Sequence, residues 1–356
     1  MKILHAADLH LDSPLGGYGA GATARLRAAL RSVPEQIVAI CRREQCDLLL
    51  LSGDVFDGPH TQDSLRELKR VLAEAKIPVI ITPGNHDFAA PGSPWLADSW
   101  PENVHLFTKP HMESLALPEL DCRIYGAAFT AMDSGTLLED FHLQGQEKYH
   151  IGVLHGDPVQ QHSPYNPITQ AQVAASGLDY LALGHVHKTG SFRAGSTLCA
   201  WPGCPMGRGY DELEEKGVLL VELEETAVIR FVPLQGPRFY ELEAPVITTA
   251  EEAVAAILPA VGNEDFYRIT VTGPCETPDL QQLELHFAQF PNLQLRDKTR
   301  PPLDLWGCIG NDSLEGIYFS LLKEAMEGQD EASRRIALLA AKISREILDG
   351  EEVVLP

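Results

Sequence analysis

Apolar runs rich in leucine or β-branched residues alternate with stretches of helical spacing in the first half of the chain. The clearest runs are residues 47–52 and 78–83, and each leads into a glycine turn. A continuous apolar run of this length is typical of a strand that is buried on both faces. Further strands of this kind are expected at residues 2–7, 122–125, 149–154 and 179–183.

Helical segments are expected between these strands. From residue 23 to residue 43, apolar side chains recur every three or four positions, and further helices are expected at 63–75 and 169–175. Residues 91–110 are expected to form a loop. Buried strands that alternate with helices predict an α/β architecture.

The pattern becomes mostly β between residues 188 and 235, with strands expected at 190–193, 197–201 and 217–223. These strands suggest a second sheet packed on the first. The expected fold is therefore an α/β (α+β) sandwich of two mixed β-sheets flanked by helices.

After residue 238 the alternation begins again and predicts a compact βαβαβ module. Its expected elements are strands at 239–247, 266–271 and 293–295 and helices at 249–258 and 278–290. A Pro-Pro pair at 301–302 marks a linker, and tail helices are expected at 313–327 and 331–348. We thus predict three parts, residues 1–236, 237–300 and 301–356.

The last helix has one apolar face and an opposite basic face. The apolar residues are Ile336, Leu339, Ala340, Ile343 and Ile347. Packing on the chain's own cap and docking onto a partner protein are equally compatible with this pattern.

Composition is that of a soluble globular protein, with 44% hydrophobic and 22% charged residues. No apolar run approaches the roughly 20 residues that span a bilayer, so we expect no membrane association. The N-terminus lacks the apolar segment of a signal peptide. The seven cysteines are scattered without a Cys-x2-Cys pair, which favours free thiols in the reducing cytoplasm.

The formal net charge of −22 argues against simple electrostatic binding to nucleic acid. Affinity for the phosphate backbone comes from clustered lysine and arginine, and the chain has no long basic run. If the protein acts on DNA, metal ions, local patches or a partner must supply the attraction.

Five of the predicted strands end in polar residues that can bind metal or move protons. They are Asp8 and His10, Asp54 and Asp57, Asn85, His86 and Asp87, His155, and His185 and His187. Alone, each has an ordinary explanation: Asp54 could be a helix N-cap, and His155 a hydrogen-bonded core histidine. Together they lie where α/β sheets collect their ligands. Because desolvating such groups is costly unless they are paired or metal-bound, one shared metal centre explains them all.

Asp, His and Asn ligands without cysteine suit Mn²⁺, Fe²⁺, Zn²⁺ or Mg²⁺. Seven candidate ligands are too many for one ion and suit two ions that share a bridging carboxylate. Two ions roughly 3.5–4 Å apart can hold a hydroxide between them and clamp a phosphoryl group for in-line displacement.

The polar strand ends, taken in order, resemble the five-block signature of the calcineurin-like metallophosphoesterases. The blocks are Asp8-x-His10, Gly53-Asp54-x-x-Asp57, Gly84-Asn85-His86-Asp87, His155 and Gly184-His185-x-His187. Residues 5–14 and Gly207-Arg208 before Lys216-Gly217 resemble the SbcD and YhaO branch, the bacterial DNA repair exonucleases.

The resemblance implies two divalent ions, manganese first, with magnesium, iron and zinc as alternatives. It implies that one ion is held by Asp8, His10, Asp54 and His187, and the other by Asp54 (bridging), Asn85, His155 and His185. His86 would donate a proton to the leaving oxygen or stabilise the transition state, with Asp57 or Asp87 orienting it.

The resemblance also implies roles for the rest of the chain. Residues 237–300 resemble in position a capping module that helps to hold DNA, and the tail resembles a segment that docks on an SbcC-like coiled-coil ATPase. That partner could bring the basic DNA-binding surface, and a homodimer is expected. One departure is Trp201-Pro-Gly-Cys204, where the family often has Tyr-Pro-Gly-Ser; it bears on substrate contacts rather than on metal binding.

The expected function is a two-metal DNA exonuclease or endonuclease that acts in DNA repair. The alternative is a phosphatase or small-molecule phosphodiesterase on the same site, which the negative charge favours. A scaffold that has lost its chemistry is the third reading, and the intact ligand set argues against it.

Overall fold

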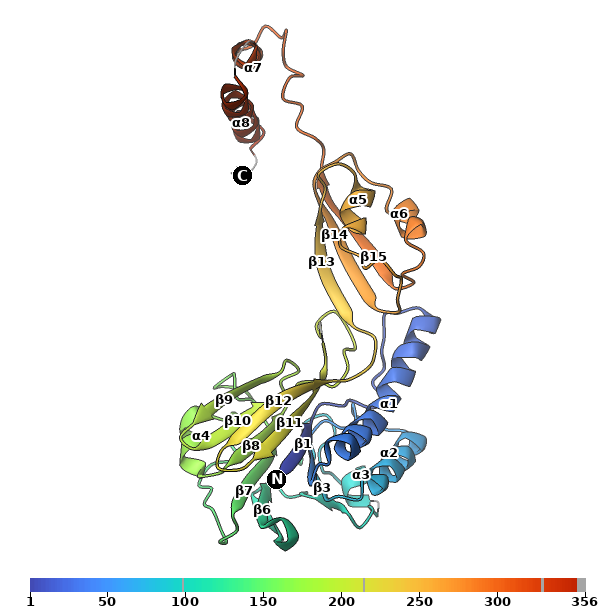
Figure 1. Ribbon diagram of the computed structural model, residues 1–356, viewed down its shortest axis with the longest axis vertical. Helices are drawn as coiled ribbons and strands as arrows, with labels where there is room; N and C mark the ends of the chain where they lie inside the picture. Colours follow the sequence, from blue (N-terminus) through green and yellow to red (C-terminus); the bar gives the residue numbers. More distant parts are fainter. Residues whose placement is uncertain (98, 214, 328–329, 351–356) are drawn as a thin grey trace. The chain divides into compact units, whose positions relative to one another are not determined.

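The computed structural model describes residues 1–97, 99–213, 215–327 and 330–350, which divide into two compact units (Figure 1). The first unit comprises Met1–Glu241 with Glu264–Tyr267, and the second comprises Leu242–Asn263 and the chain from Arg268 onward. The last six residues of the predicted tail, 351–356, lie outside the described residues. The three-part division at residues 236 and 300 stays a prediction.

The first sheet of the first unit has six strands in the order β12-β11-β1-β2-β3-β4. They are β1 (Lys2–Ala6), β2 (Leu48–Ser52), β3 (Val79–Thr82), β4 (Val104–Leu106), β11 (Gly217–Leu223) and β12 (Ala227–Pro233). Strands β1 to β4 are parallel, with Ala6 opposite Leu51 and Ser52 opposite Thr82. The carboxyl ends of β1, β2 and β3 therefore lie together at one edge.

The second sheet also has six strands, in the order β5-β6-β7-β8-β10-β9. They are β5 (Glu113–Leu117), β6 (Cys122–Gly126), β7 (Tyr149–His155), β8 (Tyr180–Gly184), β9 (Gly190–Ala194) and β10 (Thr197–Trp201). A 3-10 turn, Pro118–Leu120, joins β5 to β6. The neighbours β7 and β8 are parallel, with His155 opposite Gly184, so their carboxyl ends also lie together.

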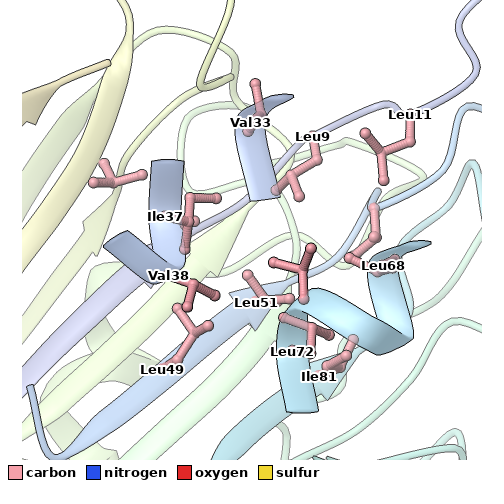
Figure 2. Close-up of a cluster of buried hydrophobic side chains, with 14 of the residues drawn as sticks. Leu9, Leu11, Val33, Ile37, Val38, Leu49, Leu51, Leu68, Leu72 and Ile81 are labelled. Atoms are coloured by element: carbon pink, nitrogen blue, oxygen red, sulfur yellow. The ribbon is translucent and has the colours of Figure 1, made fainter. Parts of the chain in front are cut away.

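The continuous leucine run of β2 is buried on both faces. Leu48 and Leu50 belong to an apolar layer that includes residues of both sheets, such as Ile151 and Tyr180. The alternate residues of β2 pack on the other face against α1 (Ala20–Glu44) and α2 (Gln62–Ala75). Figure 2 shows Leu49 and Leu51 among side chains of these helices, such as Ile37 and Leu72.

Caps mark where the shorter helices begin. The hydroxyl of Thr61 accepts a hydrogen bond from the Ser64 N–H at the start of α2. The helix α4 (Gln170–Ser176) begins with a capping box formed by Thr169 and Gln172. These local signals explain why both helices begin close to the predicted residues.

The two-sheet α/β sandwich predicted from the sequence is confirmed, but two details are wrong. Residues 91–110 contain the helix α3 (Pro94–Ala97) and the edge strand β4 in addition to loop. The strands of residues 188–235 do not form a sheet of their own: β9 and β10 extend one sheet, while β11 and β12 complete the other. The sequence predicts where short strands occur but not which strands they pair with.

The second unit contains the module and the tail. Strands β13 (Phe239–Pro245), β14 (Phe266–Pro274) and β15 (Leu293–Arg300) form a three-stranded sheet. The helices α5 (Ala250–Ala255) and α6 (Leu280–His286) lie in the connections between these strands. The first residues of β13 and β14 belong to the first unit. The tail helices α7 (Leu314–Met326) and α8 (Glu331–Leu348) pack together around Phe319 and Ala341. Among the helices in the described ranges, none has the length and apolar character that crossing a bilayer requires.

Candidate metal centre

The polar residues predicted at the strand ends converge on one site of the first unit. Asp8 and His10 follow β1, and the segments after β1 and β2 are joined by backbone hydrogen bonds. The Asp8 N–H donates to the Gly53 carbonyl (3.1 Å), and the His10 N–H donates to that of Asp54 (2.9 Å). Strands β7 and β8 bring the remaining histidines from the other sheet, where the His185 N–H donates to Asp8 Oδ1 (2.9 Å).

Several of these residues have a left-handed backbone conformation that side chains other than glycine seldom adopt. The φ angles are 53° at Asp8, 46° at His10, 51° at Asp54 and 101° at His185. Such strain persists only where surrounding contacts hold it, and it is concentrated at functional sites. Four of the predicted ligands therefore depend on these hydrogen-bonded turns for their direction.

Two glycines allow the close approach of the segments. A Cβ atom on Gly53, whose φ is +89°, would lie 2.3 Å from the Nδ1 atom of His155. A Cβ atom on Gly84 would lie 2.2 Å from the Oδ1 atom of Asp54. Both positions therefore require glycine because there is no room for a side chain, and Gly53 requires it also because of its positive φ.

The Asp54 carboxylate lies between two groups of imidazoles. Its Oδ2 atom is 3.3 Å from His155 Nε2 and 3.8 Å from His10 Nε2. Its Oδ1 atom accepts a hydrogen bond from the His86 N–H at 2.9 Å. A carboxylate with neighbours on both sides is placed as a bridging ligand would be.

On one side of Asp54, an amide and two imidazoles point to a common place. The Asn85 Oδ1 atom is 2.9 Å from His155 Nε2 and 3.2 Å from His185 Nδ1. On the other side, His10 Nε2 lies 3.1 Å from His187 Nε2. Ligand atoms of Asp8, His10 and His187 lie within 4.8 Å of one another, as do those of Asp8, Asp54 and His155.

The donor set fits divalent ions. The Nε2 atoms of His10 and His187 lie 3.1 Å apart, and two neutral rings at this distance can form only one hydrogen bond. A bound cation would instead use the Nε2 lone pairs of both rings. Oxygen and imidazole donors without thiolate are what Mn²⁺, Fe²⁺, Zn²⁺ and Mg²⁺ accept. The Cys204 sulfur lies within 4.8 Å of ligand atoms of His187 and Glu212 and contacts the carbonyl oxygen of His187.

Charge at the site favours a bound cation. Burial alone lowers the pKa of His155, but the carboxylates of Asp54 and Asp8 outweigh it and raise the pKa to about 9. Burial raises the pKa of Asp54, but the surrounding imidazoles outweigh it and lower the pKa below its usual range. The pocket is therefore negative until imidazolium protons or metal ions compensate it.

His86 differs from the other histidines of the site. Its side chain is 45% exposed, whereas those of His10 and His155 are fully buried. Its Nδ1 atom lies 2.8 Å from Asp57 Oδ1, and this hydrogen bond raises the pKa of His86. Asp57 also contacts His10 Nδ1 at 3.3 Å. An exposed imidazole beside a carboxylate is suited to donate a proton to a ligand.

The two carboxylates predicted to orient His86 have different surroundings. Asp57 contacts the ring directly, as described above. Asp87 instead accepts hydrogen bonds from three backbone N–H groups, those of Gly84 (2.8 Å), Val55 (2.8 Å) and Phe56 (3.1 Å). Burial and the Asp54 carboxylate raise the pKa of Asp87 to about 7. Its contacts are those of a residue that holds the turns after β2 and β3 together.

Sequence reasoning did not include Arg208 and Glu212 in the site. Glu212 Oε1 lies 2.8 Å from His187 Nδ1, and the Arg208 Nη1 atom lies 3.6 Å from Asp57 Oδ2. Both residues precede β11 in an irregular segment. The sequence offered two signals, the resemblance carried by Gly207-Arg208 and the spacing of four residues between the oppositely charged Arg208 and Glu212.

The chain is similar in sequence to a known family and to several bacterial proteins. Residues 1–189 match the family described as calcineurin-like phosphoesterase. The chain is 33% identical over 239 residues to the protein named "Uncharacterized metallophosphoesterase YhaO" of Bacillus subtilis, covering 63% of this chain and 57% of that protein. It is 24% identical over 255 residues to a protein of the same organism that is named as a subunit of the nuclease SbcCD, covering 60% of this chain and 63% of that protein. The chain thus spans less than two thirds of the length of these relatives.

A solved dimetal phosphatase from Danio rerio covers 65% of this chain and 95% of its own, with 13% identity and a TM-score of 0.43. The family of the chain follows from the sequence match to residues 1–189. That match covers more than half of the chain and contains all five polar strand ends. The chain belongs to the calcineurin-like phosphoesterase family, whose members hydrolyse phosphoesters at a dinuclear metal site.

Proposed function

We propose that this protein is a two-metal-dependent phosphodiesterase that cuts DNA in repair, together with an SbcC-like coiled-coil ATPase. The observation that carries the metal-dependent part is the position of Asp54 between two groups of imidazoles. The DNA-directed part is supported by the likeness to two proteins, one of them named as a nuclease subunit.

In this proposal, Asp8, His10, Asp54 and His187 hold one ion, and Asp54, Asn85, His155 and His185 hold the other. Manganese is the first candidate, with magnesium, iron and zinc as alternatives. When bound, two such ions supply an activated nucleophile and stabilise the charge of the phosphoryl group. The left-handed turns at Asp8 and Asp54 fix the backbone from which their carboxylates extend.

His86 acts on the substrate rather than on the ions. Its contact with Asp57 engages the Nδ1 proton and raises the pKa of the ring, so in the imidazolium form Nε2–H is the group that would donate to the leaving oxygen. Asp57 also contacts His10, and it therefore sets the position of the donor and of one ligand together. Asp87 supports this arrangement by holding the turn that carries Asn85 and His86.

The tail is the proposed docking segment for the ATPase. On α8, Ile336 is 70% exposed and Ile347 is 61% exposed, and on α7, Leu321 is 60% exposed. Apolar side chains that remain exposed within the second unit favour docking over packing on the chain's own cap. A basic partner surface would offset the net charge of −22 when DNA binds. The capping role of the module, a homodimer and a cytoplasmic location belong to the same proposal.

The alternative is a phosphatase or small-molecule phosphodiesterase on the same site. The net charge is the observation that favours it, because an acidic protein repels the DNA backbone. The module and the tail favour the nuclease, since a small substrate needs neither a cap nor a docking segment.

The test is incubation of the full chain with Mn²⁺ and labelled duplex DNA, with and without the SbcC-like ATPase, beside the small diester bis-p-nitrophenyl phosphate. We expect cleavage of both substrates, with DNA cleavage greater when the ATPase is present. Asp54→Ala is the matched inactive control. Hydrolysis of the small diester without DNA cleavage in either condition would replace the nuclease by the alternative.

A further inference from the structure

The Arg208–Glu212 pair connects two histidines of the metal centre. The Glu212 carboxylate is 2% exposed and lies 2.8 Å from His187 Nδ1. This contact fixes the proton of the imidazole on Nδ1 and leaves the lone pair on Nε2, the atom that faces His10. Carboxylates in this position hold metal-binding histidines in the ligand tautomer and raise their basicity.

Arg208 fixes the carboxylate in turn. Its backbone N–H donates to Glu212 Oε2 (2.8 Å), its Nε to the same oxygen (3.2 Å) and its Nη2 to Oε1 (2.6 Å). Both carboxylate oxygens are therefore occupied by one residue, which restricts the rotation of the Glu212 side chain. Such a bidentate pair is also the favoured way to bury a glutamate charge.

The same guanidinium extends to the other side of the site. Its Nη1 atom lies 3.6 Å from Asp57 Oδ2, and Asp57 Oδ1 contacts the Nδ1 atoms of His10 and His86. Arg208 thus lies between two carboxylates, and each carboxylate holds a histidine by its Nδ1 atom. With two acidic partners, its charge is already compensated before any substrate phosphate arrives.

We propose that Arg208 and Glu212 are positioning residues that set the affinity of the ion at Asp8, His10 and His187, and leave the ion at Asn85, His155 and His185 unaffected. The inference rests on the proposed two-metal function and adds an asymmetry to it. Glu212 contacts His187 and has no contact with the imidazoles of the second group among the described hydrogen bonds. Removing its charge should therefore affect one ion only.

The experiment is calorimetric titration of the metal-free full chain with Mn²⁺, without substrate. We expect the wild type to bind two ions and Glu212→Gln to lose about 10- to 100-fold in affinity for one of them, the loss typical of such supporting residues. Glu222→Gln on β11, which removes an exposed carboxylate of the same unit, is the matched control and should bind as the wild type does. Unchanged affinity for both ions in Glu212→Gln, or an equal loss for both, overturns the proposal.

Arg208→Gln provides the second variant, and it carries the test if Glu212→Gln does not fold. We expect it to weaken the same ion by less, because Glu212 still contacts His187. If Arg208 instead contacts the substrate phosphate, Arg208→Gln raises KM for the diester without changing either Mn²⁺ affinity, and the proposal is wrong. A wild type that binds fewer than two ions refutes the proposed function itself, so the two failures are distinct.

Discussion

The Nδ1 atom of His86 lies 2.8 Å from Oδ1 of Asp57, on the half-exposed side of a site whose other histidines are mostly buried. The neighbouring residue in the chain, Asn85, instead contacts His155 and His185 with its amide oxygen. Two adjacent residues of one turn thus have different surroundings, and the proposed function gives them different tasks, metal binding to Asn85 and proton donation to His86.

Replacement of His86 by alanine should separate these tasks. We expect kcat to fall by about 10² to 10⁴, the usual contribution of a general acid, while both ions stay bound. Metal content by mass spectrometry and diester turnover are the measurements, with exposed His111→Ala as the control. Loss of metal in parallel with activity would make His86 a ligand.

The pH dependence of the reaction should depend on Asp57. Its hydrogen bond raises the pKa of His86, so the imidazolium persists to higher pH and the rate falls as pH rises through that pKa. In Asp57→Asn the pKa is lower, and the basic limb of kcat/KM should move to lower pH. Metal content must be measured alongside, because Asp57 also contacts His10. A basic limb in the same place would show that another group donates the proton.

Asp54→Ala should reduce the metal content below two ions per chain. The carboxylate lies next to imidazoles of both groups, so its removal takes a ligand from each ion and unbalances the buried charge. Equilibrium dialysis with Mn²⁺ measures the result, and the circular dichroism spectrum of the metal-free protein checks the fold. Full retention of both ions would refute the bridging role.

Asp87→Ala should destabilise the protein rather than act on the chemical step. Three buried N–H groups would lose their acceptor, and we expect the free energy of unfolding to fall by about 3 kcal/mol. Asp87→Asn should lose less, because its amide oxygen still accepts. Urea unfolding of the metal-free protein measures the effect against exposed Asp133→Ala. A stable variant with low kcat would instead place Asp87 in catalysis.

Much of the fold follows from local patterns. The leucine run of β2 predicts a doubly buried strand, and the strand is found within one residue of the predicted bounds. The partner of each strand was not predictable, because β9 and β11 belong to the same β-rich stretch of sequence but join different sheets. Pairing depends on contacts between distant residues, which periodicity does not encode.

The candidate site, like the fold, could be predicted only in part. Residues at the carboxyl ends of strands, such as Asp54 and His155, were predictable because parallel strands bring these ends together. Glu212 was not, because it reaches His187 from an irregular segment whose path depends on tertiary packing. The different contacts of Asp57 and Asp87 were not predictable from the sequence either. Asp57 contacts the His86 ring, whereas Asp87 accepts a hydrogen bond from the backbone of Gly84.

In the proposed function, hydrolysis of phosphodiesters depends on two ions held by this one site. The most direct measurement is hydrolysis of bis-p-nitrophenyl phosphate by metal-free protein during stepwise addition of Mn²⁺, at protein concentrations well above the dissociation constants. We predict that activity rises until two ions are bound per chain and then stays constant. Full activity at one ion per chain, or activity that persists without metal, would refute the two-ion mechanism.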